Sequence, residues 1–351
     1  MPQNSRKKPT IRDVAREADV SIGTVSNALN RPESIHPDTL ARVRKAIAHL
    51  DFQPSPGARS RRRKSLLPQK SQGDEAIGIL LLGERGLTWI MREAPIYAYA
   101  LHGAEQEATQ QGRPCNVLHA QDVAGLRAIW HNIPRGGLIL LAGDQAPGFP
   151  SDFSLPPIVK IMGLSNTRWG DCCTYSSYGT GRTAAEYLHG EGCQRVGCLS
   201  GEQRGVSAVR SQGLDDTLAA LGIPVSVKPD RDPFAGWHQP DDEAILADLK
   251  SLLKKPKPID GLFITADLLA PACYRALKKL GIKPGVDVAI VTCNNERPYL
   301  ADLNPQPAVI DIHAELIGSE AVKLLDWRRS QPDEPRRTLM IEPTLIAPTP
   351  H

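Results

Sequence analysis

The fold is decided first between Thr10 and Leu50, where the chain reads TIRDVAREADVSIGTVSNALNRPESIHPDTLARVRKAIAHL. This stretch predicts three short helices. Thr10 is an N-cap residue with Asp13 three positions later, an acidic variant of the capping box, and Ser21 is a second N-cap. Pro37 opens the third helix, because proline fits the first helical position. Helices this short are stable only when they pack against one another and bury their apolar side chains. The apolar residues at helical spacing that we expect to pack together are Ile11, Val14, Ala15, Ala18, Val25, Ala28, Leu29, Leu40, Val43, Ile47 and Leu50.

The turn over Asp19 and Val20 gives the first two helices the pattern of a helix-turn-helix. A plain helical bundle with a solvated basic face would have the same periodicity, so charge has to decide between the two. Residues 1–70 contain 15 Lys and Arg against 6 Asp and Glu, a net charge of +9, whereas the whole chain of 351 residues has only +3. A small basic module joined to a mildly acidic remainder is typical of a protein that binds nucleic-acid phosphates at one end.

Several residues of this segment stand in a distinctive order, namely Thr10-Ile11-Arg12-Asp13-Val14-Ala15, Val20-Ser21, Thr24-Val25-Ser26, Leu29-Asn30 and Pro54-Ser55. In this order they resemble the LacI/GalR (lactose-repressor-like) family of transcriptional regulators. The resemblance implies that the second helix enters the major groove of double-stranded DNA, with some side chains on bases and others near phosphates. The DNA-binding residues that it implies in this module are Thr10, Ser21, Ile22, Gly23, Thr24, Ser26, Asn27 and Asn30.

Asn27 stands where many members of the family carry Arg. An Asn side chain can hydrogen-bond adenine through N6 and N7, whereas Arg suits guanine. We therefore expect an operator half-site that differs from that of the Arg-bearing relatives.

Residues 53–75 form a linker by composition, because Pro, Gly, Ser and basic residues dominate them. In the family this stretch is a hinge helix that inserts a Leu into the minor groove. Ser55, Ala58 and Arg59 fit that pattern and are expected to bind DNA, but Arg61 stands in the place of the Leu. Two interpretations of the linker stay open. Arg61 enters a narrow, A-tract minor groove as a cation, or the segment is a solvated basic tether that only adds phosphate contacts.

Beyond residue 76, short apolar runs alternate with helical stretches, which predicts a mostly parallel α/β sheet. The remaining length of about 275 residues suits two such sheets better than one. The expected strands are 77–82, 115–119, 138–142, 158–162, 196–199, 262–265 and 288–292. The expected helices are 96–111, 181–189, 207–221, 241–253, 268–280 and 314–328.

The resemblance extends over this body, through Gly181 with Ala184, through Arg195-Val196-Gly197, and through Val206-Ser207-Ala208 with Arg210. It implies an N-terminal three-helix helix-turn-helix domain plus a periplasmic-binding-protein-like body of two α/β subdomains with parallel sheets. The implied domains are 1–52 for DNA binding, 53–75 for the hinge and 76–351 for effector binding and dimerisation. Within the body, one subdomain is expected at 76–173 and 297–325, and the other at 174–296 and 326–351.

The same resemblance implies a small-molecule effector in the cleft between the subdomains. Arg210 stands where the family has an Arg that clamps the effector, and a guanidinium suits a carboxylate, a phosphate or a pair of hydroxyls. Without the resemblance, Arg210 would be interpreted as a surface salt-bridge residue. The expected effector-binding residues are Trp89, Tyr97, Trp169, Tyr175, Arg210, Asp267 and Asn294, the aromatic ones because rings stack on sugars or bases. Asn294-Asn295 replaces an acidic pair of sugar-responsive relatives. Because carboxylates that would bind sugar hydroxyls are partly lost, the prediction of a neutral sugar as the effector is weaker.

Signals of metal binding or catalysis are weak. The 7 cysteines show no paired C-x-x-C spacing and no His at zinc-site distance, so no structural metal is expected. No phosphate-binding loop and no G-x-S-x-G elbow is found in the sequence, and we expect neither an enzyme nor a bound cofactor. The N-terminus lacks the apolar region of a signal peptide and no apolar run has membrane length, so we expect the bacterial cytoplasm, at the nucleoid.

Together these observations predict a DNA-binding transcriptional regulator, a repressor, that binds a pseudo-palindromic operator as a homodimer and responds to a sugar or a related metabolite. The alternative is a cytosolic small-molecule binding protein whose affinity for DNA is incidental. Only the regulator requires the basic three-helix module, which is the feature that discriminates between the two.

Overall fold

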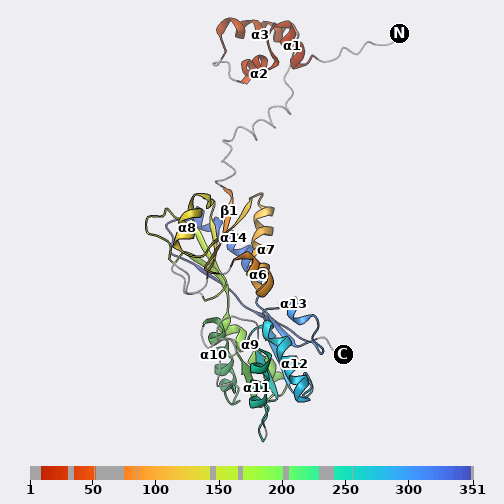
Figure 1. The fold of residues 1–351 in the computed structure, drawn as a ribbon. Helices are drawn as coiled ribbons and strands as arrows, with labels where there is room; N and C mark the ends of the chain where they lie inside the picture. The colour runs from red at the N-terminus through yellow and green to blue at the C-terminus, as the bar shows by residue number, and fades with distance from the viewer. Residues whose placement is uncertain are drawn as a thin grey trace, which may run out of the picture. The chain divides into compact units, whose positions relative to one another are not determined.

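The computed structural model describes residues 9–30, 35–50, 52, 75–84, 86–142, 148–164, 169–200, 205–228, 241–254 and 256–348. The chain divides into two compact units, residues 1–70 and residues 71–351, and each is described by itself (Figure 1). The first contains the basic module and the second the α/β body. In the described residues no helix is long and apolar enough to cross a membrane.

The N-terminal unit consists of the three predicted helices, α1 (Ile11–Glu17), α2 (Ile22–Asn30) and α3 (Pro37–His49). They bury a common core whose members are Val14, Ala15, Ala18, Val25, Ala28, Val43 and Ala46. Between α1 and α2 the chain turns at Asp19, whose φ of 49° lies in the left-handed region that Asp tolerates better than most residues. The amide of Val20 closes this turn by donating to the carbonyl of Ala15 at 3.0 Å. The predicted helix-turn-helix is confirmed.

The first sheet of the body has six strands, all in parallel pairs, in the order β10-β5-β4-β3-β1-β2. Its strands are β1 (Ile77–Leu82), β2 (Cys115–Ala120), β3 (Leu138–Ala142), β4 (Ile158–Ile161), β5 (Asp171–Tyr175) and β10 (Thr338–Ile341). Alternate residues of β1 serve opposite faces, because side chains of a strand alternate. One face packs on α7 (Pro95–Gln110) and α14 (Ala314–Ser330), with the short α6 (Leu87–Glu93) beside them. The other packs on α8 (Val123–Ile129) and the turn η2 (Trp130–Asn132).

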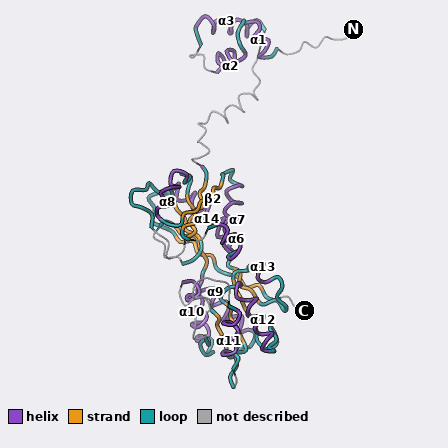
Figure 2. The backbone as a smooth tube through the Cα atoms, viewed as in Figure 1, coloured by secondary structure: helices purple, strands orange, loops and turns teal. Residues whose placement is uncertain are grey.

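The second sheet has five strands in the order β11-β9-β8-β7-β6, of which only β11 is antiparallel to its neighbour. The strands are β6 (Val196–Leu199), β7 (Gly261–Ile264), β8 (Ala289–Cys293), β9 (Ala308–Asp311) and β11 (Thr344–Ile346). The helices of this half are α9 (Ser177–Gly190), α10 (Gly205–Ala220), α11 (Asp242–Leu252), η3 (Asp267–Leu269), α12 (Ala270–Leu280) and α13 (Arg297–Leu300). One core lies between the sheet and α9 with α10, and another between the sheet and α11 with α12 (Figure 2).

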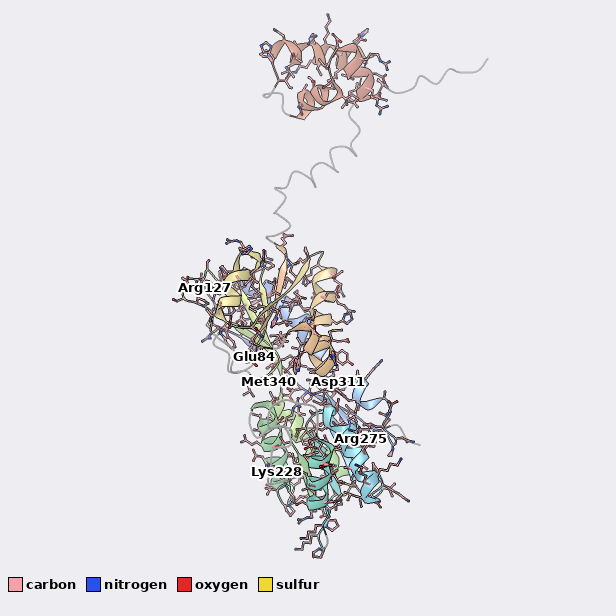
Figure 3. The ribbon with its side chains drawn as sticks, in the orientation of Figure 1. Glu84, Arg127, Lys228, Arg275, Asp311 and Met340 are labelled. Carbon is pink, nitrogen blue, oxygen red and sulfur yellow. The ribbon has the colours of Figure 1, made fainter. Side chains whose placement is uncertain are left out.

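Two of the predicted subdomain boundaries are wrong. The chain leaves the first sheet after Tyr175 of β5, slightly later than the predicted 173/174. Strand β9 still pairs with β8, so the return falls after Asp311 and not at 296/297. The final crossing falls between β10 and β11 and not at 325/326. The reason is that α14 and β10 stay with the first sheet, where the Arg328 guanidinium binds the buried Asp171 carboxylate of β5 through two hydrogen bonds of 2.8 and 2.7 Å. Figure 3 shows Asp311 and Met340, the latter in β10, in the narrow part of the body where these crossings run.

Helices α9 and α10 approach each other closely through two glycines. A Cβ built on Gly181 of α9 would lie 1.9 Å from the carbonyl oxygen of Arg210, and one on Gly213 of α10 would lie 2.1 Å from the carbonyl oxygen of Tyr178. Both distances are far below van der Waals contact, so only glycine permits this packing. The pair thereby sets the depth at which α10 carries Arg210.

Replacing Gly181 by Ala tests this packing. The added methyl group has to push α10 away, and overpacking of this kind costs about 1 to 3 kcal/mol. The control is Gly190→Ala at the end of the same helix, where a Cβ would meet no atom within 4 Å. Urea unfolding followed by tryptophan fluorescence reports the body alone, because all 5 tryptophans lie beyond residue 70. Equal midpoints for both variants would contradict the proposed role of the contact.

Candidate functional site

The candidate DNA-binding surface is the outer side of α2. Ser21, Ile22, Gly23 and Asn27 are exposed there, with Ile22 at 46% exposure although it is a large apolar residue. The Ser21 hydroxyl accepts the amide of Thr24 at 3.0 Å and so caps the helix. A helix that keeps apolar and amide side chains in solvent has a face free to contact base edges.

Helix α1 begins at a second polar cap. The amide and the hydroxyl of Thr10 both donate to the Asp13 carboxylate, at 2.8 and 2.6 Å. The hydroxyl contact, followed by the backbone one, lowers the pKa of Asp13. At the far end of the module, the His49 ring lies 2.9 Å from the Glu17 carboxylate and ties α3 to α1. Helix α1 is thus capped at its start and joined to α3 at its end.

Other predicted DNA contacts lie outside the described residues. These are the side chains of Ser26 and Asn30, and the linker residues Ser55, Ala58, Arg59 and Arg61. Their roles stay predictions.

The second candidate site surrounds the buried Arg210 of α10, which is 2% exposed. Its guanidinium donates to the carbonyl oxygen of Thr265 at 2.5 Å, to the hydroxyl of Tyr175 at 2.9 Å and to Oδ1 of Asn294 at 2.9 Å. These three partners follow or end β7, β5 and β8, and the carboxyl ends of parallel strands are where α/β proteins bind ligands. The structure therefore brings together three of the predicted effector-binding residues: Tyr175, Arg210 and Asn294.

Asp267 lies in the same cluster but has a different task. It is fully buried, and its two carboxylate oxygens accept the hydroxyl of Thr292 and the amide of Glu296, each at 2.7 Å. These bonds hold the loop after β8, in which Asn294 and Asn295 have φ values of 116° and 65°. Asn adopts such angles more readily than most residues. Asp267 thus shapes the loop that presents Asn294 to Arg210.

Sequence reasoning missed Glu296, the second buried acid of the cluster. It is 3% exposed, and its carboxylate accepts Nδ2 of Asn294 at 2.9 Å and the amide of Ile96 at 3.0 Å. Burial raises the pKa of Glu296. The resemblance points to the Asn294-Asn295 pair itself, whereas the left-handed turn there brings the next residue into the site. The sequence signal that could have identified Glu296 is an acidic residue directly after two Asn residues in a turn.

The predicted aromatic residues are only partly associated with this cluster. Trp89 and Tyr97 pair with ring centroids 6.3 Å apart beside the start of α7, next to the Ile96 amide that Glu296 binds. Trp169 packs against the core on the α8 side of the first sheet. The described residues contain no group of His, Cys, Asp or Glu placed to hold a metal ion.

Comparisons with known proteins match both units. Residues 10–55 match the family described as bacterial regulatory proteins, lacI family, and residues 185–347 match the periplasmic binding protein-like domain. The chain is 25% identical over 350 residues to the HTH-type transcriptional repressor PurR of Pectobacterium atrosepticum, covering 96% of this chain and 95% of that protein. It is 27% identical over 354 residues to PurR of Yersinia pestis bv. Antiqua, with the same two shares covered.

Solved structures agree on the fold. The transcriptional regulator CelR in complex with cellobiose has a TM-score of 0.62 and 21% identity, over 97% of this chain and 99% of that one. The Lac repressor dimer bound to operator and the anti-inducer ONPF has a TM-score of 0.59 and 19% identity, over 97% and 98%.

The three-helix module and the two-sheet body match the domains of helix-turn-helix regulators of transcription, and the PurR relatives are named as transcriptional repressors. The chain thus has a lacI-family helix-turn-helix domain and a periplasmic-binding-protein-like domain, as the resemblance in its sequence implied.

The buried acids give the body a pH dependence that can be measured. Burial, followed by the neighbouring Glu296 carboxylate, raises the pKa of Asp267 well above 3.8. A carboxyl group that binds its proton more tightly when folded loses stabilising free energy as the pH rises through its folded pKa. Asp267→Asn removes this titration. The difference in unfolding free energy, wild type minus variant, should therefore fall as the pH rises from about 5 to 8.

Urea unfolding of both proteins across this pH range provides the measurement, with tryptophan fluorescence as the signal. Arg275→Gln, which removes the exposed ion pair with Asp242, is the control for a charge change away from the cluster. A pH-independent difference between wild type and Asp267→Asn would show that Asp267 keeps an ordinary pKa.

Proposed function

We propose that this regulator represses transcription by binding a pseudo-palindromic operator as a dimer, with α2 of each copy in the major groove. The observation that carries the proposal is the exposed face of α2, where Ile22, Gly23 and Asn27 stand free beside the cap at Ser21. The PurR relatives are named as transcriptional repressors and align over nearly the full chain. Operator binding also implies the cytoplasm, where the DNA is.

In this proposal Ile22, Gly23 and Asn27 read bases, while Thr10, Ser21, Thr24, Ser26 and Asn30 lie nearer the phosphates. Asn27 can pair with adenine in the major groove. Ser55, Ala58, Arg59 and Arg61 of the linker add contacts near the minor groove or to the phosphates. The exposed basic residues of α3, such as Arg44 and Lys45, add long-range attraction for DNA.

We further propose that the Arg210 cluster binds the small-molecule effector, with Tyr175 and Asn294 as its neighbours. Nε of Arg210 is buried and has no hydrogen-bond partner among the described residues. A buried donor without a partner is costly, and a ligand oxygen would satisfy it. The solved CelR structure contains cellobiose and the Lac repressor structure contains ONPF, which supports a sugar or a related metabolite.

Selection of genomic fragments by the purified full-length protein at near-physiological salt tests operator binding, followed by footprinting of the best fragment. Enrichment of a pseudo-palindrome supports the proposal, and genes beside it supply metabolites to test as effectors. Binding that depends on salt but not on sequence would favour the alternative, a small-molecule binding protein with incidental DNA affinity.

Substituting Asn27 and Arg59 separates base reading from phosphate binding. Asn27→Ala should relax the preference at one operator position, because a bidentate base contact is worth about 1 to 3 kcal/mol of discrimination. Arg59→Ala should weaken binding to all sequences and lower the slope of log affinity against log salt by about 1. Fluorescence anisotropy with operator variants at several salt concentrations measures both. If both variants lose affinity equally on every sequence, Asn27 does not read a base.

A further inference from the structure

Helix α7 begins without a cap of its own. Its N-cap residue is Ala94, whose side chain cannot accept a hydrogen bond, and Pro95 at the first helical position has no amide hydrogen. Ile96 therefore carries the first amide of the helix that needs an acceptor. That acceptor is the Glu296 carboxylate, 200 residues further along the chain, at 3.0 Å in a buried position.

The two partners belong to different halves of the body. Helix α7 packs on α14 against the first sheet, whereas Glu296 follows β8 of the second sheet. The next residue adds a second link, because the main chain of Arg297 hydrogen-bonds the phenol of Tyr99 on α7. Figure 1 shows α13, which starts at Arg297, beside the end of the upper half that carries α6 and α7. This short segment therefore joins the two halves, in addition to the hydrogen bond from Arg210 of α10 to Tyr175 of β5.

Glu296 is also connected to Arg210. Nη2 of Arg210 donates to Oδ1 of Asn294 at 2.9 Å, and Nδ2 of the same Asn donates to Oε2 of Glu296 at 2.9 Å. Oε1 of Glu296 then accepts the Ile96 amide. Three hydrogen bonds therefore run without interruption from the guanidinium to the first turn of α7. The Asn294 amide binds Arg210 through its oxygen and Glu296 through its nitrogen. A rotation of this amide therefore changes both hydrogen bonds together, which couples Arg210 to Glu296.

The charges around Glu296 suit this position. The positive end of the α7 dipole and the Arg210 guanidinium favour its carboxylate, whereas the buried Asp267 opposes it. The Tyr99 phenol of α7 and the Cys293 thiol of β8 are further titratable groups near its carboxylate. The Glu296 main chain is itself held by Asp267, so the carboxylate is aimed at α7 by a rigid loop.

We propose that Glu296 is a latch that holds the two halves of the body together by capping α7. A ligand oxygen that takes Nη2 of Arg210 away from Asn294 frees the amide of this Asn to turn and loosens the latch. The link between the latch and the operator rests on the proposed function, whereas the latch itself does not.

Hydrogen exchange measured by mass spectrometry on the effector-free, full-length protein tests the latch. In Glu296→Ala, exchange should rise about tenfold or more both in the first turn of α7 and in residues 294–300, because a charge-assisted hydrogen bond joins them. In Glu296→Gln, which keeps an oxygen for the Ile96 amide, the rise should be smaller. Strands β1 and β7 should stay protected in both variants, which shows that the body is folded.

The matched control is Glu315→Gln. Glu315 is an exposed acid that also faces the Tyr99 phenol, but it supplies no cap to α7. Its substitution should leave exchange in both segments unchanged. If exchange in Glu296→Ala rises only in α7, Glu296 caps the helix but does not hold the two halves together. If exchange rises in neither Glu296 variant, the hydrogen bond between Glu296 and Ile96 does not stabilise the protein.

Operator affinity of the same variants, measured by fluorescence anisotropy, tests the coupling. A change of at least about threefold in Glu296→Ala, with none in Glu315→Gln, supports it. If a variant shows faster hydrogen exchange but unchanged operator affinity, the latch exists but is not coupled to operator binding. If wild type itself selects no operator, the proposed function fails while the exchange result still stands.

Discussion

The body is organised around the burial of one guanidinium. A charged group removed from water is tolerated only where acceptors surround it. Arg210 obtains three, from a main-chain carbonyl, a phenol and an amide, and each comes from the end of a different strand. The strands must therefore end at the same level, and the loop after β8 must adopt left-handed angles at two Asn residues to present its acceptor. The remaining polar groups of the cluster, Asp267 and Glu296 among them, shape that loop.

The packing that carries this arginine is equally constrained. Gly181 and Gly213 allow α9 and α10 to touch through their main chains, which brings α10 over the strand ends. Helices α7 and α14 use the same device on the first sheet, through Gly103 and Gly318. Each half is thus a sheet with tightly packed helices on both faces, and specific polar contacts such as Ile96–Glu296 and Arg210–Tyr175 join the halves. Such a construction lets the halves move as bodies while their interiors stay unchanged.

Prediction from the sequence succeeded where the signal is local. The three helices of the basic module follow from their N-cap residues and apolar spacing. The turn follows from Asp19, because Asp tolerates left-handed backbone angles better than most residues. Seven strands of the body follow from apolar runs. It failed where partners are distant: β9 and β10 were assigned to the wrong halves, because a local pattern does not reveal which sheet a strand joins. Glu296 was missed for the same reason, since its partner Ile96 lies 200 residues away.

The sequence alone determined that the chain has a basic helix-turn-helix module, an alternating α/β body and the order of residues typical of the lacI family. These properties depend on neighbouring residues, whose propensities and spacing can be read along the chain. Only the tertiary structure decided which strands share a sheet, that Arg210 is buried among Tyr175, Thr265 and Asn294, and that an acid of one half caps a helix of the other. Those contacts depend on how distant segments pack, and no local pattern specifies that.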